Sequence, residues 1–114
     1  MRTYQLGLLK VVPGAPAADA DAQRAHLQHI AAMQAALADA GLMPAEIGDV
    51  NAHGTGTSEN DRVEGLALSK VFGSYTDAPP VSSNKSMIGH TMSAAGVIEA
   101  LFSVLTLRNG LLPP

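Results

Sequence analysis

Hydrophobic and polar residues follow one another along this chain in a pattern that predicts strands and helices in alternation. Segment 3–12 is short, apolar and partly alternating, which is typical of a strand, and a loop rich in proline and small residues follows it. Strong helix formers dominate from about 21 to 40, with apolar residues at steps of three and four that predict one buried face. The residues of that face are Ile30, Met33, Leu37 and Ala40.

A second strand and a second helix follow. Gly41 ends the first helix and Pro44 prevents its renewal. Segment 46–52 then predicts a short strand, and residues 60–72 predict a helix that Gly73 closes.

The start of this second helix and the last two elements complete the pattern. Ser58 and Asp61 have the spacing of a capping box at the start of the second helix. Segment 81–85 is predicted to be a short strand or extended, and residues 90–108 predict a last helix. The order β-α-β-α-β-α favours the α/β class, with a parallel or mixed sheet covered by helices.

The last helix is apolar around most of its circumference, which predicts burial on more than one side. Glu99 lies in its middle, and a buried carboxylate needs a cationic partner, for which Lys85 is the nearest candidate. The alternative is that Glu99 lies on a narrow exposed strip. The apolar residues are Ala94, Val97, Ile98, Leu101, Phe102, Val104, Leu105 and Leu107.

Composition narrows the class of protein. The chain has 114 residues, which suits one domain or part of one, and it is 46% hydrophobic and 15% charged. A net charge of −3 without a basic stripe argues against nucleic acid and anionic membranes as partners. There is no cysteine, and hence no disulfide, thiolate metal site or cysteine nucleophile. The N-terminal residues lack the features of a signal peptide and no apolar run could span a bilayer, so we expect a cytoplasmic protein.

Two histidine segments carry the candidate chemistry, and both are predicted to follow strands, where α/β proteins gather their sites. In the segment HGTGT, Gly54 and Gly56 permit positive φ or a close approach to a ligand. Thr55 and Thr57 alternate with them, so both hydroxyls point the same way toward an elongated polar ligand, with His53 at the head. The alternative is a structural Gly–Thr turn that the histidine merely caps.

The second segment places His90 at the start of the predicted last helix, where the helix dipole favours a neutral imidazole. Two neutral histidines that donate to one carbonyl oxygen form an oxyanion hole. Lys85 could bias the local field, hold Glu99, or only mark a solvated loop.

The segments NAHGTGTSEND and VSSNKSMIGHTMSAAG, in this order and separation, resemble the C-terminal part of the β-ketoacyl-acyl-carrier-protein synthases. The similarity is close from about 38 to 114 and looser before that. These acyltransferases catalyse the decarboxylative Claisen condensation of an acyl thioester with malonyl-acyl carrier protein in fatty-acid or polyketide biosynthesis. The resemblance implies acyl carrier protein as a partner. It implies no metal, nucleotide or flavin cofactor, since the substrates are carried on the phosphopantetheine of acyl carrier protein.

The resemblance also implies roles for individual residues. His53 and His90 would be the catalytic histidines that bind the malonyl thioester carbonyl, promote decarboxylation and stabilise the enolate. Lys85 would be the active-site lysine, with Glu99 as its ion-pair partner.

Four further residues gain a role in the same way. Thr55 and Thr57 would hold the phosphopantetheine arm, and Asp61 and Glu64 would support the site. Asn84 is a departure, because many relatives carry a small or hydroxyl-bearing residue there.

The implied fold is the thiolase-like five-layer αβαβα sandwich of two similar halves. Residues 1–114 resemble most of the second half, as one incomplete domain without linker or second domain, and lack its closing strands. The nucleophilic cysteine of the family lies in the preceding half. We therefore expect an open sheet edge, an open helix face, and a dimer, an oligomer or dependence on a cysteine-bearing half.

Other interpretations remain open at this point. The chain could be a non-catalytic partner of the chain-length-factor type, or a truncated pseudo-enzyme without activity of its own. It could also be a small metal-dependent hydrolase. The ligands of that metal would be His53, His90, Asp61 and Glu64. His26 and His29, three apart on the first helix, could face one metal but lack a third ligand nearby.

Overall fold

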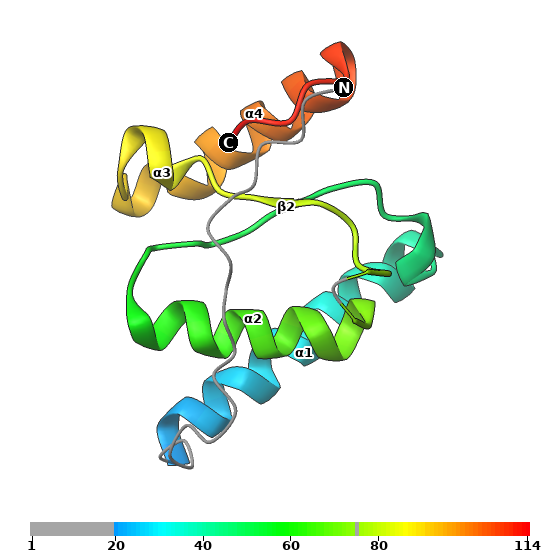
Figure 1. Ribbon diagram of the computed structural model, residues 1–114, viewed down its shortest axis with the longest axis vertical. Helices are drawn as coiled ribbons and strands as arrows, with labels where there is room; N and C mark the ends of the chain where they lie inside the picture. Colours follow the sequence, from blue (N-terminus) through cyan, green and yellow to red (C-terminus); the bar gives the residue numbers. More distant parts are fainter. Residues whose placement is uncertain (1–19, 75) are drawn as a thin grey trace.

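The structure is a computed structural model that describes residues 20–74 and 76–114, so the strand predicted at 3–12 lies outside the described residues. Along the described chain, two strands are separated by one helix and flanked by further helices, two of which are short 3₁₀ helices, η1 and η2 (Figure 1). The elements are α1 (Ala20–Ala40), η1 (Pro44–Glu46), β1 (Val50–Asn51), α2 (Ser58–Phe72), β2 (Val81–Ser82), α3 (Lys85–Ile88), η2 (Met92–Ala94) and α4 (Ala95–Asn109).

The two strands are parallel, which confirms the mixed α/β class. Val50 pairs with Val81 and Asn51 with Ser82. The Ala52 amide extends the pairing by donating to the Ser82 carbonyl at 2.8 Å. Helix α2 forms the crossover between the strands, and the strand pair lies between α2 on one side and α4 on the other (Figure 1). Both strands are shorter than the segments predicted from the sequence.

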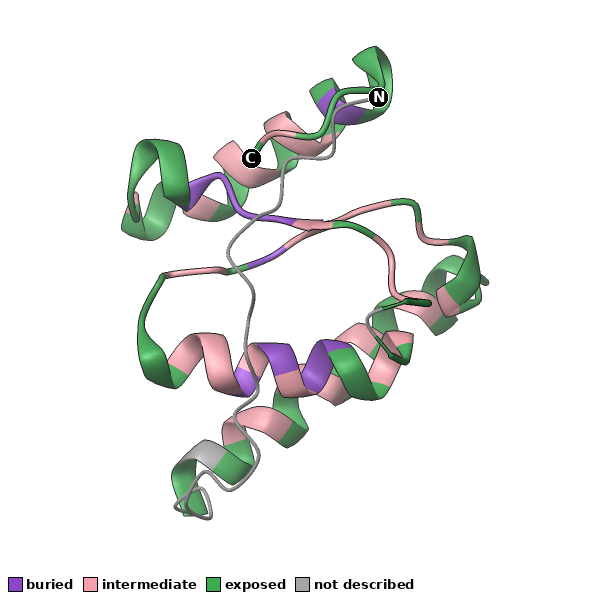
Figure 2. Cartoon of the chain, viewed as in Figure 1, coloured by how far each residue is buried: buried purple, intermediate pink, exposed green. Residues whose placement is uncertain are grey.

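The apolar core lies where α2 packs against α1 and the strands. Val63, Ala67 and Leu68 of α2 are buried together with Ala52 (Figure 2). The predicted apolar face of α1 contributes Ile30, Met33 and Leu37, which are half-buried, whereas Ala40 is exposed. Burial of each such aliphatic side chain stabilises the fold by roughly 1.5–3 kcal/mol when it is complete.

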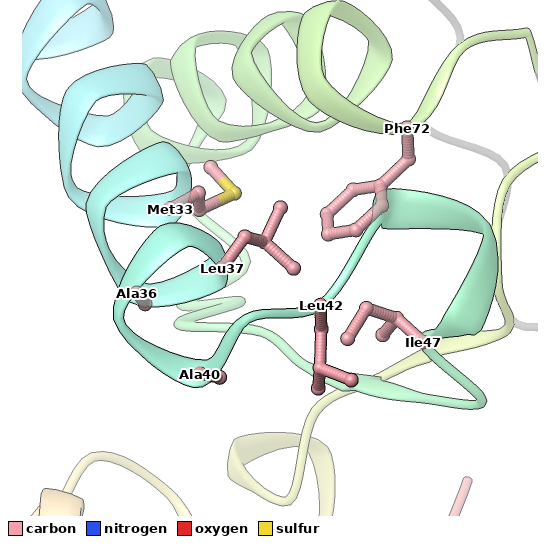
Figure 3. Close-up of a pocket in the computed structure, with 7 residues that line it drawn as sticks. All are labelled: Met33, Ala36, Leu37, Ala40, Leu42, Ile47 and Phe72. Carbon is pink, nitrogen blue, oxygen red and sulfur yellow. The ribbon is translucent and has the colours of Figure 1, made fainter.

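An apolar hollow remains at one end of this core, where the C-terminal end of α1 meets η1 and the end of α2 (Figure 3). Its volume is about 210 Å³. The lining residues are Met33, Ala36, Leu37, Ala40, Leu42, Ile47 and Phe72.

Helix α2 begins with a cap that differs from the predicted one. Thr57 is extended at φ −90° and ψ 140°, and its hydroxyl accepts a hydrogen bond from the Asn60 amide at 3.4 Å. Ser58 already lies inside the helix, so the predicted capping box of Ser58 and Asp61 is wrong. The predicted end is confirmed, because Gly73 closes α2 at φ 89°.

The last helix starts later than predicted, which moves His90 out of it. Gly89, just after α3, has φ 72° and Met92, the first residue of η2, has φ 52°, and these two positive-φ residues turn the chain from α3 into η2. Regular α-helix begins only at Ala95. His90 therefore lies in a connecting segment, and the prediction that a helix N-terminus acts on it is wrong.

Helix α4 is exposed over most of its surface, although its sequence predicts burial. Thr106 is its one buried residue, and several of its large apolar side chains are exposed (Figure 2). Burial on more than one side is thus wrong for this chain alone, while the expected open helix face is confirmed. No helix in the described ranges combines the length and the apolar character needed to cross a membrane. The exposed apolar residues of α4 are Val97, Leu101, Val104, Leu105 and Leu107.

Candidate active site

The structure brings His53 and His90 together, as the positions of their segments after two parallel strands predict. His53 follows β1, and His90 follows β2 by way of α3. The ring centroids are 5.3 Å apart and the planes meet at 85°, with both side chains exposed. Two imidazoles at this separation can both hydrogen-bond to one small group that binds on their solvent-exposed side.

Glu64 holds the backbone around His53. One carboxylate oxygen accepts the His53 amide at 2.7 Å and the other accepts the Gly54 amide at 2.9 Å. Asn60 donates its side-chain amide to the second oxygen at 3.1 Å. Hydrogen bonds to a charged acceptor are about twice as strong as neutral ones, so Glu64 restrains the position of His53.

Asp61 restrains the same loop at a later residue, Gly56. Its Oδ1 accepts the Gly56 amide at 3.2 Å and the Asn60 side-chain amide at 3.2 Å. Asn60 therefore joins both carboxylates, a role that the sequence analysis missed. The signal was available, because Asn60, Asp61 and Glu64 lie in the first turns of a helix that follows the loop directly.

Gly54 links the two histidine segments by close contact. Ser83 donates its hydroxyl to the Gly54 carbonyl oxygen at 3.2 Å. A Cβ at position 54 would lie 2.4 Å from the Ser83 Cβ, and φ at Gly54 is 47°. Both the space and the dihedral angle thus require glycine here, and Ser83 is a second contact residue that the sequence analysis missed.

Thr55 and Thr57 lie with their hydroxyls in contact. The two oxygens are 2.9 Å apart, which agrees with the predicted common direction of the side chains. The Thr57 hydroxyl also caps α2. A threonine hydroxyl has one proton and two lone pairs, so each retains capacity for a further hydrogen bond.

The hydrogen bond at His90 sets which of its nitrogens can donate. The Met92 amide donates to Nδ1 of His90 at 3.0 Å, so Nδ1 acts as an acceptor. In a neutral imidazole the proton is then on Nε2, which can donate to a ligand. This donor was predicted from a helix dipole, but the backbone turn at Met92 provides it instead.

The predicted pair of Lys85 and Glu99 is confirmed. The Lys85 ammonium donates to Oε1 of Glu99, and the side chains are 5% and 22% exposed. Glu99 is also attached to the sheet, because Asn51 donates its side-chain amide to the Glu99 carbonyl oxygen at 3.0 Å. An exposed strip for Glu99 is therefore wrong, and Lys85, the first residue of α3, is held against α4.

The geometry does not favour the metal-dependent hydrolase. Asp61 and Glu64 accept backbone amides rather than converge with the histidines. Across residues 20–74 and 76–114, no three His, Asp or Glu side chains lie close enough to hold one metal ion. His26 contacts α2 instead, with Nδ1 3.4 Å from the Val63 carbonyl oxygen.

Fold and site together define an α/β protein whose parallel strands lead into two facing histidines, with a lysine–glutamate pair that joins α3 to α4. Residues 13–114 match the family model described as "Beta-ketoacyl synthase, C-terminal domain". The chain therefore belongs to the β-ketoacyl synthase family, which confirms the resemblance found in its motifs.

Individual relatives agree with this assignment. Over 84 residues the chain is 45% identical to nodulation protein E of Rhizobium sp. (strain N33), an alignment that covers 74% of this chain and 21% of the relative. Over 82 residues it is 44% identical to 3-oxoacyl-(acyl-carrier-protein) synthase 2 of Coxiella burnetii, covering 72% and 20%. The corresponding synthase 2 of Staphylococcus aureus is 45% identical over 83 residues, covering 73% and 21%. The chain thus spans about a fifth of the length of these relatives.

Proposed function

We propose that this chain provides the C-terminal part of the active site of a β-ketoacyl-acyl-carrier-protein synthase, serving fatty-acid or polyketide biosynthesis. The observation that carries the proposal is the facing pair of His53 and His90, with Nε2 of His90 left as a donor. Membership of the family and relatives named as acyl-carrier-protein synthases support it.

The proposed reaction is a decarboxylative Claisen condensation. The bond between the malonyl carboxylate and the α-carbon breaks, CO₂ leaves, and the electron pair moves onto the thioester carbonyl oxygen. His53 and His90 donate hydrogen bonds to that oxygen and stabilise the enolate. The enolate carbon then attacks an acyl thioester, whose cysteine thiolate leaves. Loss of one donor to a developing oxyanion lowers the rate about 100- to 1,000-fold in comparable sites.

The remaining predicted residues have supporting roles in this proposal. Lys85 and Glu99 form an ion pair that joins α3 to α4. In this proposal the positive charge of Lys85 favours the negative charge that develops on the substrate. Thr55 and Thr57 contact the phosphopantetheine arm through the hydrogen-bonding capacity that they retain.

Other parts of the enzyme must complete the site. The chain has no cysteine, so the acyl-carrying thiol comes from elsewhere, and the partner that we propose is a cysteine-bearing ketosynthase half. Together the two form the five-layer αβαβα sandwich, and acyl carrier protein delivers the malonyl group. The exposed apolar face of α4 is consistent with a surface that such a half covers.

The test is to co-express the chain with a cysteine-bearing N-terminal ketosynthase half and to measure CO₂ release from malonyl-acyl carrier protein. We expect His53→Ala and His90→Ala each to lower the rate at least about 100-fold. His26→Ala is the matched control, because His26 lies on α1 against α2, and it should leave the rate unchanged. A stable complex without CO₂ release would contradict catalysis and favour the non-catalytic, chain-length-factor type of partner. Failure to form a soluble complex would favour a truncated pseudo-enzyme.

A further inference from the structure

Four consecutive polar residues, Ser82 to Lys85, are buried in this chain, and Asn84 has 0% of its surface exposed. Two of them have partners that account for their burial. Ser83 donates to the Gly54 carbonyl, and Lys85 pairs with Glu99. The other two, Ser82 and Asn84, need a separate explanation.

Their side chains make no hydrogen bond with any part of the chain that the structure describes. This holds for the hydroxyl of Ser82 and for both Nδ2 and Oδ1 of Asn84. Oδ1 of Asn51 is buried in the same way. Because buried polar groups are nearly always hydrogen-bonded, these four atoms indicate a shared partner that is not a protein group of the described chain.

The four atoms belong to neighbouring positions. Asn51 and Ser82 are register partners on the two parallel strands, so their side chains lie on the same face of the sheet. Asn51 donates from that face to the Glu99 carbonyl and to the Ser103 hydroxyl, both on α4. Ser82 therefore faces α4 as well, and Asn84 follows it by two residues at the start of α3.

We propose that this polar cluster, Asn51, Ser82 and Asn84, binds ordered internal water between the strands and α4. A water molecule can donate two hydrogen bonds and accept two, which matches the donors and acceptors left over here. A cation would leave the Asn84 N–H groups without an acceptor. Asn84 has no exposed surface, so its partner has to be small enough to be enclosed with it, as a water molecule is.

The water would join the strand end to the segment that carries Lys85. Asn84 immediately precedes Lys85 and its carbonyl oxygen accepts the Met87 amide at 3.0 Å within α3. This inference concerns the inside of the chain and does not rest on the proposed catalytic activity, so either can fail without the other.

The test is NMR detection of magnetisation transfer between water and the Asn84 side-chain amide protons in the full chain. We expect cross-peaks with the sign of a long-lived complex in the wild type, whereas Asn84→Leu keeps roughly the same shape but removes the polar atoms that would hold the water. Asn84→Leu should lower the urea midpoint of unfolding, because the buried Asn51 Oδ1 and Ser82 hydroxyl would lose the water that satisfies them. No water contact at the wild-type amide, or a higher urea midpoint in Asn84→Leu, would overturn the proposal.

Two smaller variants keep the test decisive if Asn84→Leu does not fold. Ser82→Ala removes one water ligand and should weaken the cross-peaks at Asn84. Ser93→Ala is the control, since Ser93 is an exposed serine of η2, and it should leave them unchanged. Equal cross-peaks in all three proteins would overturn the part assigned to Ser82.

Discussion

Segment 82–85 and helix α4 have opposite relations between residue type and burial. The segment is entirely polar and entirely buried, whereas the helix is apolar and mostly exposed (Figure 2). The segment is buried because it runs from β2 into α3 beside α4, where Ser83 and Lys85 find specific partners. The helix is exposed because the described chain contacts it only in part, through Asn51, Lys85 and the C-terminal residues, and leaves most of its large apolar side chains uncovered.

This contrast separates what the chain completes by itself from what it leaves for a partner. The polar segment carries Lys85 and contacts Gly54 through Ser83. The chain therefore assembles this part of the candidate site, the Ser83–Gly54 contact and the Lys85–Glu99 pair, by itself. The apolar surface of α4 is what the chain leaves for a partner, because exposed apolar patches favour association. Four predictions test the contrast.

The largest expected effect comes from breaking the buried ion pair. Lys85→Met should lower the free energy of unfolding by about 3–5 kcal/mol, because Glu99 is left as a partly buried charge without its partner. Urea denaturation measures it. Adding Glu99→Leu should recover most of the loss, since the unpaired charge is then removed.

The control for that prediction is the surface pair of Arg62 and Glu59, with N and O 3.1 Å apart and side chains 27% and 67% exposed. Glu59→Ala should cost at most about 1 kcal/mol. Equal costs for the two pairs would contradict the view that burial gives the Lys85 pair its importance.

Leucine-to-alanine substitutions should have very different effects on stability in the two helices that flank the strands. Leu68 of α2 is 8% exposed, and Leu68→Ala should cost about 2–4 kcal/mol in thermal or urea unfolding. Leu107 of α4 is 84% exposed, and Leu107→Ala should change stability by less than about 0.5 kcal/mol. A large cost at Leu107 in dilute solution would mean that a second copy already covers α4.

A smaller effect is expected where the buried segment contacts the His53 loop. Gly54→Ala should cost about 1–3 kcal/mol, because its Cβ would lie 2.4 Å from the Ser83 Cβ at a φ of 47°. Gly56→Ala is the matched control, with φ 74° and no atom within 4 Å of its Cβ, so only the backbone strain of about 1 kcal/mol remains. If both variants lost the same stability, the contact with Ser83 would not be what requires glycine.

The smallest effect concerns Asp49, a carboxyl group just before β1 with one buried oxygen that has no partner in the described chain. Desolvation by burial raises its pKa above the ordinary 3.8, and a hydrogen bond from the Val50 backbone opposes this only in part. The folded protein therefore holds this proton more tightly than the unfolded chain. The contribution of Asp49 to the free energy of unfolding should therefore be lost as the pH rises from 3.8 through the folded pKa.

Urea unfolding across that pH range, compared with Asp49→Asn, measures the contribution. The wild type should become less stable relative to the variant as pH rises. A parallel pH dependence of the two proteins would show that burial does not disfavour the charge at Asp49.

The sequence by itself determined the features that depend on local pattern, and the pairing of a buried charge that requires an opposite charge. The periodicity of α1, the glycine that ends α2, the parallel α/β order and the pairing of Lys85 with Glu99 were all predictable. A charge in an apolar helix demands a partner, and motif spacing identifies a family, whatever the details of packing. The roles assigned to the site residues stay predictions until activity is measured.

Only the tertiary structure decided where the remaining groups lie. Thr57 rather than Ser58 caps α2, and a left-handed turn at Met92, not a helix end, directs the hydrogen bond at His90. Asn51 and Ser83 gained their partners from segments far away in the sequence. Burial depends on which surfaces meet, and a single chain's pattern of apolar residues records the surfaces that need covering, not whether this chain covers them.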